Sequence, residues 1–364
     1  MRKNLLIFAF KNQYTLKNKY KIATIYGAAH GINDFIAGFL LSILVYQSNN
    51  LTANSIAFLV YSVIAFGGQL PAGILVDKTQ NIKSFSLISL LLMIVAIALS
   101  YFSIFTAIVF SGLASAFIHV CGGAACYVSE QKNVTIAGIF TSPGVVGLIV
   151  GGIAGTMHFS YFYLFILPIA LLVFLLSKIT IPSYSNIKKN NNELQLLDTH
   201  DFFMLILLVA IAFRSLIWNV LHMMCYSDTN WLLAIAFSAG FGKLIGGFIS
   251  DKVNWKKFVF ITTIGAAIFL NIGKNILPIF CIGVALLQSA VPITLLLMQN
   301  YMRNSPATAT GLSLGVAIAL AGLPTYLQQF RQIQNNKLVF LVFSMFFILS
   351  NIWTVWKFKK SSFT

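Results

Sequence analysis

The chain has 364 residues, of which 58% are hydrophobic and only 9% are charged, and its mean hydropathy is +0.86. So few charges cannot cover the surface of a water-soluble protein, so the composition excludes soluble enzymes and disordered proteins and predicts an integral membrane protein. The net charge of +16 is assigned to loops beside the membrane, and no nucleic-acid partner is expected.

The N-terminal segment, residues 1–21, is basic and contains one short apolar run at positions 5–10. This run is shorter than the hydrophobic region of a signal peptide, which needs about 7–15 residues. We therefore expect residues 1–21 to form a cytoplasmic segment that lies along the membrane interface.

Twelve apolar stretches follow, each close to the length that crosses a hydrocarbon core of about 30 Å as a helix. They cover residues 22–46, 54–76, 84–101, 104–128, 134–156, 160–179, 202–225, 229–250, 257–273, 276–300, 306–328 and 338–356. Several connections are only a few residues long, so neighbouring helices are expected to be antiparallel. The longest connection divides the stretches into six and six.

The sequence thus predicts an all-α integral membrane fold of twelve transmembrane helices, arranged as two six-helix halves. The expected units are a first half at 22–179, a cytoplasmic linker at 180–201, a second half at 202–357 and a tail at 358–364. Lys and Arg concentrate in alternate loops, and the other set of loops holds only Lys274, Arg331 and Lys337. This bias predicts cytoplasmic termini in a plasma-membrane protein.

An internal repeat supports the two halves. The ends of the second and eighth stretches share Gly-x-x-x-Asp-Lys, formed by Gly73, Asp77 and Lys78 and by Gly247, Asp251 and Lys252. Residues 135–138 and 308–311 match at nearly the same offset along the chain. The shared pattern places a small residue where helices approach and charges at the cytoplasmic mouth, as an ionic latch between helices or as a cap that serves topology alone.

Two six-helix halves that both carry this pattern resemble the major facilitator superfamily of transporters. The first half is further similar to fosmidomycin-resistance-type drug antiporters, whose first helix carries His-x-x-Asn-Asp, matched here by His30, Asn33 and Asp34. Their fourth helix carries Gly, small residues and then Phe-x-His, matched by residues 112–119. The residues after His119 are Val120 and Cys121, where those antiporters carry Pro and Glu.

Three charged residues are expected inside the membrane, where a charge costs several kcal/mol unless it is paired or hydrated. They are Asp34, Arg214 and Lys243. Asp34 and Arg214 lie at similar depths, about 20 Å from the cytoplasmic boundary, which predicts a pair across a central cavity. Lys243 aligns with Gln69 in the repeat, so it has either a role in one half only or a side chain that extends to the cytoplasmic surface.

His30 and Asp34 are four residues apart, on one helix face, with Asn33 near its edge. This spacing predicts a proton-binding carboxylate beside an imidazole, whereas a structural hydrogen bond is the alternative role for His30. His119 is expected at the depth of His30, either in the same cavity or as a structural residue. We therefore assign substrate or proton binding to His30, Asn33, Asp34, His119, Arg214 and Lys243.

The stretch 134–156 contains Pro143, Gly147 and Gly151, a small face on which another helix can pack and slide. Such a face suits alternating access and is also ordinary membrane packing. It resembles an antiporter motif loosely, which indicates efflux.

No metal or cofactor site is predicted. Residues 222–225 read His-Met-Met-Cys, but adjacent residues of a helix point in different directions and cannot converge on one ion. The four cysteines have no zinc-type spacing, and no nucleotide-binding loop is present in the sequence.

The sequence therefore predicts a proton-coupled secondary transporter that exports a small molecule by alternating access, with the lipid bilayer as its environment and a monomer as its state. Three alternatives stay open: a proton symporter that imports a small organic anion, a lipid flippase, and a membrane-embedded enzyme. The enzyme would require His30, Asp34 and His119 to converge within a few ångströms. The transporter requires a central cavity.

Overall fold

The computed structural model describes residues 2–47, 50–157, 162–184, 199–322 and 350–351, and within these ranges all regular secondary structure is helical. Nine helical spans in this part of the chain are long and apolar enough to cross a membrane. Two shorter apolar spans, Phe162–Lys178 and Pro306–Gly322, match the predicted stretches 160–179 and 306–328. The predicted stretch 338–356 lies almost wholly outside the described residues.

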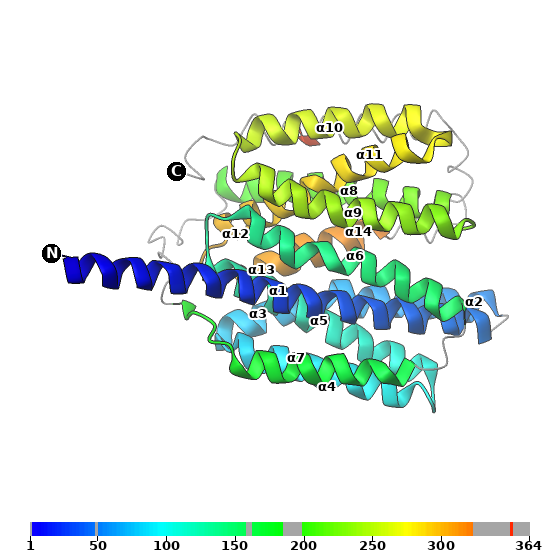
Figure 1. Ribbon diagram of the computed structural model, residues 1–364. Helices are drawn as coiled ribbons and strands as arrows, with labels where there is room; N and C mark the ends of the chain where they lie inside the picture. Colours follow the sequence, from blue (N-terminus) through cyan, green and yellow to red (C-terminus); the bar gives the residue numbers. More distant parts are fainter. Residues whose placement is uncertain (1, 48–49, 158–161, 185–198, 323–349, 352–364) are drawn as a thin grey trace.

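The described part of the first half contains seven α-helices (Figure 1). They are α1 (Arg2–Gln47), α2 (Leu51–Ser62), α3 (Gln69–Thr79), α4 (Ile82–Leu99), α5 (Ile104–Ser129), α6 (Val134–Thr156) and α7 (Ile166–Lys178). A π-helical turn at Val63–Gly67 joins α2 to α3 within one span. Asparagine side chains cap several helices; Asn133, for example, accepts a hydrogen bond from the backbone N–H of Ile136 at the start of α6.

The described part of the second half also contains seven α-helices. They are α8 (Thr199–Cys225), α9 (Thr229–Ser250), α10 (Trp255–Ile272), α11 (Leu277–Ser289), α12 (Val291–Tyr301), α13 (Pro306–Thr310) and α14 (Ala317–Gly322). Helices α11 and α12 form one span, and a π-helical segment at Gly311–Val316 joins α13 to α14. Asp228 caps α9 by accepting from the backbone N–H groups of Asn230 and Trp231.

The expected N-terminal segment continues into the first span. Helix α1 runs without a break from Arg2 to Gln47. The reason is local, because no Gly or Pro precedes Gly27 and nothing therefore interrupts the helix. The part of α1 that is apolar enough to span a membrane begins at Asn18.

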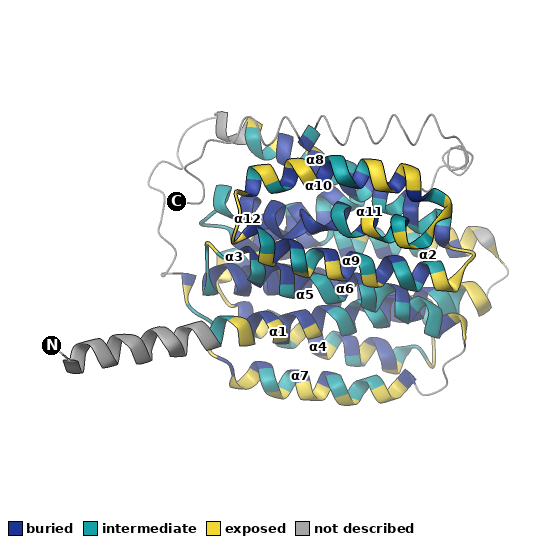
Figure 2. Cartoon of the chain, turned by 45° about the horizontal axis from the view of Figure 1, so that its top comes forward, coloured by how far each residue is buried: buried dark blue, intermediate teal, exposed yellow. Residues whose placement is uncertain are grey.

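The two halves meet through α6 and α9, which pack against each other, and through α13, which packs on α3 and α5. Helix α1 lies along α6, while α7 and α10 lie at opposite edges of the bundle (Figure 1). Buried residues gather on the inner helices, and exposed residues line the outer faces of α7 and α10 (Figure 2). The core therefore lies at the centre, where both halves contribute helices.

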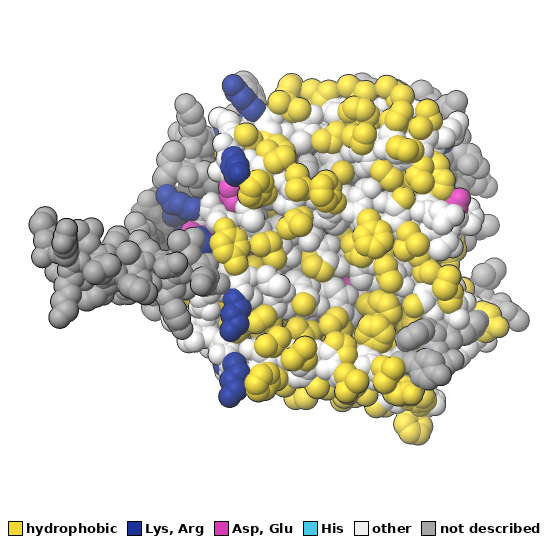
Figure 3. All heavy atoms as spheres, in the orientation of Figure 1, with side chains coloured by type: hydrophobic (Ala, Val, Ile, Leu, Met, Phe, Trp, Pro, Cys, Tyr) yellow, Lys and Arg dark blue, Asp and Glu magenta, His cyan; other side chains and the backbone are white. Residues whose placement is uncertain are grey.

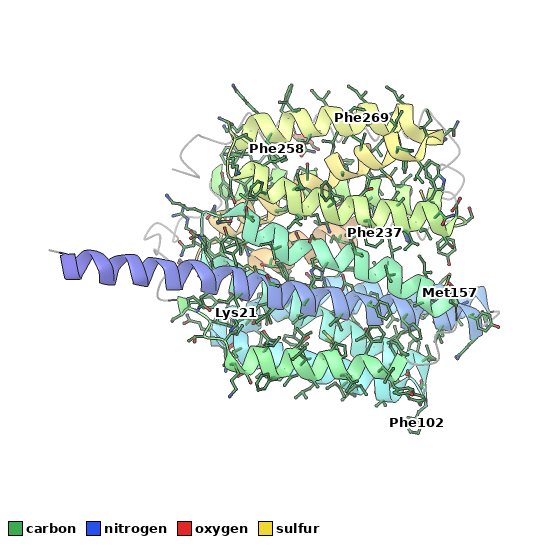
Figure 4. All side chains as sticks on the ribbon, in the orientation of Figure 1. Lys21, Phe102, Met157, Phe237, Phe258 and Phe269 are labelled. Carbon is green, nitrogen blue, oxygen red and sulfur yellow. The ribbon has the colours of Figure 1, made fainter. Side chains whose placement is uncertain are left out.

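The outer surface fits a lipid environment. Its exposed large side chains are mostly apolar, such as Leu167, Phe174 and Ile261. On the face in Figure 3, Lys and Arg side chains gather at one end of the bundle, and hydrophobic side chains are spread over the surface between its two ends. Lys21 lies toward that basic end, and Phe102 and Met157 lie at the opposite end (Figure 4). These features describe a multi-pass membrane protein.

Candidate functional site

A cavity of about 570 Å³ lies between the halves. Both halves line it, with residues from α1, α2, α5 and α6 on one side and from α8, α9 and α14 on the other. Its lining runs from Thr141 in the middle of α6 to Val45, Thr156 and Tyr226 near the ends of their helices. Those ends lie away from the basic end, so the cavity extends toward the opposite end of the molecule.

Three predicted site residues meet at the cavity wall. The Nε2 atom of His30 lies 3.2 Å from Asp34 Oδ2, and the Nε2 atom of His119 lies 3.8 Å from Asp34 Oδ1. The two imidazole rings are 4.3 Å apart between centroids and are arranged edge to face. All three residues line the cavity. We call this group the His-Asp-His cluster.

The hydrogen bonds of the two rings define their tautomers. Nδ1 of His30 lies 3.0 Å from the carbonyl oxygen of Phe140, and Nδ1 of His119 lies 2.7 Å from that of Ser115. A carbonyl oxygen only accepts, so both Nδ1 atoms carry hydrogen, and in a neutral imidazole Nε2 then presents a lone pair. Both Nε2 atoms face Asp34, whose ionised carboxylate also only accepts.

Lone pairs would therefore face lone pairs if both rings were neutral and Asp34 were ionised. A proton between His30 Nε2 and Asp34 Oδ2 removes this conflict, because it turns the 3.2 Å contact into a hydrogen bond. The geometry therefore suits a group that takes up one proton beyond the two on the Nδ1 atoms, either on the His30 ring or on the Asp34 carboxyl group. His30 has a structural role as well, because the hydrogen bond from its Nδ1 atom to the carbonyl oxygen of Phe140 links α1 to α6.

The position of His30 depends on a glycine in the neighbouring helix. A Cβ atom added at Gly144 would overlap Nε2 of His30. Any larger residue at position 144 would therefore displace the ring from Asp34. The sequence analysis did not select Gly144 for this role, because the contact joins residues that are distant in the chain.

Two residues beside Asp34 have positions that the sequence did not indicate: Asn33 lies outside the cavity lining, and Tyr61 lies in it. Asn33 is buried and donates its side-chain N–H to Asp34 Oδ1 over 2.9 Å, so it supports the cluster without lining the cavity. Tyr61 of α2, which the sequence analysis did not select, is buried at the cavity wall and interacts electrostatically with Asp34. A lone tyrosine in an apolar stretch carries no pattern that would identify it.

The predicted ion pair between Asp34 and Arg214 is wrong in this structure. Both residues line the cavity, but Asp34 is paired with the two histidines. Arg214 instead donates from Nη2 to Thr294 Oγ1 over 3.0 Å. Depth along a helix predicts how far each group lies from the membrane surface. It does not predict which side chains point toward each other.

Lys243 lies at the cavity and does not extend to the cytoplasmic surface. It is partly buried, and its Nζ atom lies 3.4 Å from the carbonyl oxygen of Thr141, across the boundary between the halves. It interacts electrostatically with Asp34 and with Arg214. Its repeat partner Gln69 is buried and packs on Gly315.

The His-Asp-His cluster also has the donor set of a metal site. One ligand atom from each residue can be chosen so that all three lie within 4.8 Å of one another. Transition metals accept two histidines and one carboxylate, and the hydrogen bonds from Nδ1 to backbone carbonyls are typical of histidine ligands. In the described part of the chain, His222 and Cys225 belong to no such group. His222 and Met223 line the cavity.

Asp77 and Asp251 connect the halves near the basic end. Asp77 at the end of α3 accepts hydrogen bonds from the backbone N–H groups of Ala307 and Thr308, at 3.0 and 2.7 Å, and from the Thr308 hydroxyl. These groups form the N-terminus of α13 in the other half. A carboxylate at a helix N-terminus satisfies free N–H groups and the positive end of the helix dipole.

Asp251 makes the equivalent contact in the opposite direction. It accepts from the backbone N–H groups of Val134 and Thr135, at 2.7 and 2.8 Å, and from the Thr135 hydroxyl, at the start of α6. The two contacts join the halves, as a latch would, but they are not ionic. Lys78 is in no ion pair that the structure records among the described residues, and Lys252 lies over the Phe248 ring at 3.8 Å.

The glycines of the shared pattern allow these contacts. A Cβ atom added at Gly73 would lie 2.6 Å from the carbonyl oxygen of Ala307, and one added at Gly247 would lie 2.9 Å from that of Val134. Side chains at either position would force the helices apart. Tyr184, which lies after α7, donates its hydroxyl to Asp77 over 2.8 Å and was not selected from the sequence.

The small face of α6 packs on α1. Cβ atoms added at Gly147 and Gly151 would overlap the backbone carbonyl oxygens of Gly31 and Phe35. Pro143 lies against Gly31 at the same interface. The face is therefore a close helix contact within the first half.

Comparisons with known proteins address the fold. No protein-family model and no curated protein matches the chain. A solved structure of the major facilitator superfamily transporter FucP in the outward conformation matches with a TM-score of 0.70 and 14% identity, covering 94% of this chain and 100% of that one. A variant of the E. coli fucose:proton symporter FucP matches with a TM-score of 0.66 and 13% identity, covering 94% and 98%. The chain has the fold of major facilitator superfamily transporters.

Proposed function

We propose that this protein is a proton-coupled secondary transporter that moves a small molecule across the plasma membrane by alternating access. The observation that carries the proposal is the His-Asp-His cluster, which needs a proton and lies on the wall of a cavity between two repeated halves. The fold is that of transporters, and one matching structure is described as a fucose:proton symporter.

The contacts of Asp77 and Asp251 supply the gate in this proposal. Both lie near the basic end, which the charge bias assigns to the cytoplasm, and the cavity extends away from it. This arrangement corresponds to a state closed to the cytoplasm. Rocking of the halves would break both contacts together, because each joins one half to a helix N-terminus of the other.

Proton binding couples to this motion through the cluster. Protonation removes the charge of the Asp34 carboxyl group or balances it with an imidazolium ion, and a neutral cluster costs less to enclose in a low-dielectric interior. Enclosure of the cluster is therefore linked to its protonation, and this link couples substrate movement to proton movement.

Efflux stays a prediction that rests on the likeness to drug antiporters, and the monomeric state likewise stays a prediction. The membrane-embedded enzyme has one of its conditions met, because His30, Asp34 and His119 do converge. The cavity between two repeated halves and the transporter fold favour transport. No observation on the described residues supports the lipid flippase specifically.

The test uses purified protein in proteoliposomes that contain a pH-sensitive dye. Gradients of L-fucose, benzoate and ethidium represent neutral, anionic and cationic solutes, and the internal pH is followed after each gradient is imposed. At least one solute should move protons in the wild type, and Asp34→Asn should abolish this movement. Asp228→Asn is the control, because Asp228 caps α9 outside the cavity lining and asparagine also caps helices.

Proton movement that persists at the wild-type rate in Asp34→Asn would remove the cluster from the coupling mechanism. A chelator is included to separate proton from metal chemistry. Coupled transport should survive EDTA, whereas a loss that zinc restores would assign the cluster to a metal ion.

A further inference from the structure

We propose that the cavity binds the acidic group of a small organic anion at Arg214, with Lys243 as the second cation of the site. This inference deepens the proposed function by naming the substrate class, and it rests on that function. Two observations on the described residues support it: Arg214 has a hydrogen-bond donor without a partner, and the cavity wall holds more cations than carboxylates.

Arg214 has an unused donor in a buried position. Its side chain is 4% exposed and lines the cavity, and its Nη2 atom is bonded to Thr294. Its Nη1 atom is buried and has no hydrogen-bond partner among the described residues. A guanidinium group is always charged and carries five N–H donors in a plane that matches carboxylates and phosphates. A buried cation with a free donor therefore lacks an anion.

The charges around the cavity do not balance. Among the described residues, the cavity lining contains two cations, Arg214 and Lys243, but only one carboxylate, Asp34. Asp34 is hydrogen-bonded to Asn33 and contacts the two histidines, and Lys243 is bonded to a neutral carbonyl oxygen. The two cations also repel each other. A bound anion would offset this repulsion together with the cost of burying both charges.

Other titratable groups at the cavity wall do not supply the missing charge. Tyr61 and His30 face Asp34 from α2 and α1, and His119 faces it from α5. On the other half, His222 and Tyr226 lie near the outer end of α8. None of these groups is an acid that ionises near neutral pH. The site therefore becomes more cationic when the His-Asp-His cluster takes up a proton.

The other lining residues indicate the chemical character of the ligand beyond its acidic group. Trp218, Ile149 and Leu314 supply apolar surface, and Asn219 and Gln288 supply polar groups. A volume of about 570 Å³ lies within the range of small-molecule sites and exceeds what an inorganic anion needs. An anion with an apolar or aromatic body fits this combination of two cations and apolar walls.

The charge of the His-Asp-His cluster links anion binding to proton binding. Protonation of the cluster raises the positive potential near Arg214 and Lys243, so it strengthens anion binding. Proton and anion then bind cooperatively and cancel each other's charge.

The experiment measures thermal unfolding of the purified full-length protein with a matched series of probes: benzoate, benzenesulfonate and phenylphosphonate, with neutral benzamide and cationic benzylamine. The anions should raise Tm by about 2 °C or more at saturating concentration, while benzamide and benzylamine should not. In Arg214→Gln the shift should be lost, and in Arg214→Lys the affinity for the anions should fall at least fivefold. Lys274→Gln is the control, because it removes a cation outside the cavity lining and should keep the full shift.

Equal shifts with benzoate and benzamide, no shift with any anion, or a full shift in Arg214→Gln would overturn the proposal. If Arg214→Gln does not fold, the affinities of Lys243→Gln and Arg214→Lys for the anions are measured instead. Wild-type affinity in both variants would also overturn the proposal. Equilibrium binding needs no transport, so failure of the anions leaves the proton-movement test of the proposed function intact. Anion binding without proton movement would instead contradict the transporter.

Discussion

Asp77 and Asp251 occupy equivalent positions in the internal repeat, and each caps a helix N-terminus in the opposite half. Asp77 holds the start of α13 through Ala307 and Thr308, and Asp251 holds the start of α6 through Val134 and Thr135. The repeat in the sequence is thus a repeat of contacts. Since each contact crosses between the halves, both must break before the basic end can open.

Replacement of Asp77 by asparagine should weaken one latch and leave the other intact. The neutral amide loses about 1–2 kcal/mol of interaction with the α13 N-terminus, because hydrogen bonds to charged groups are the stronger ones. Hydrogen exchange of the backbone amides at 307–310 should rise about tenfold. Asp251→Asn is the matched control and should raise exchange at 134–138 instead; equal changes at both ends in either variant would contradict independent latches.

Tyr184→Phe should have a smaller effect on the same latch. The phenol donates one hydrogen bond to Asp77, worth about 1 kcal/mol. Burial, followed by the nearby Asp77 carboxylate, raises the pKa of Tyr184 far above its usual value, so the hydroxyl remains a donor at every practical pH. Exchange of the backbone amides at 307–310 should increase two- to fivefold without dependence on Tyr184 ionisation. In an Asp77→Asn background the same change should add little, and full additivity would argue against a shared contact.

Gly144→Ala should disturb the His-Asp-His cluster without changing any ionisable residue. The new methyl group overlaps the His30 ring, so either the ring moves away from Asp34 or α6 moves away from α1. We expect a loss of about 1–3 kcal/mol in stability and at least a tenfold loss of coupled proton movement. Gly67→Ala is the control, because a Cβ atom at Gly67 meets no atom within 4 Å. Wild-type coupling in Gly144→Ala would show that the position of His30 is not critical.

The topology can be tested by cysteine labelling in intact cells. The charge bias places residue 190 in the cytoplasm, in a segment outside the described residues, so Asn190→Cys should resist a membrane-impermeant maleimide until the cells are opened. Phe102→Cys is the control, since Phe102 is 88% exposed at the end away from Lys21 (Figure 4). It should be labelled directly. The reverse pattern would invert the proposed orientation.

Much of the fold could be predicted from the sequence because membrane spans follow from composition. A helix that crosses lipid must satisfy its own backbone and present apolar side chains, so the length of an apolar run is nearly sufficient to locate it. The shared Gly-x-x-x-Asp-Lys pattern likewise located both latch positions. It did not reveal their partners, because a carboxylate can bind a cation or a helix N-terminus equally well.

For the site, the sequence determined which polar residues lie in the membrane and how deep they lie. The spacing of His30 and Asp34 placed them on one helix face. Depth placed His119 level with His30, and Arg214 level with Asp34. Depth is a coordinate along one helix, and it follows from counting residues because each residue of a helix advances the chain by a fixed rise. These four residues line one cavity in the structure.

Only the tertiary structure decided which of these residues meet. Rotation of each helix about its axis and close approach at glycines, such as Gly144 beside His30, set the contacts across the bundle. They turned Asp34 toward two histidines and left Arg214 with Thr294 and an unused donor. Helix rotation depends on packing against neighbours that are distant in the chain, and a single sequence contains no local signal for it.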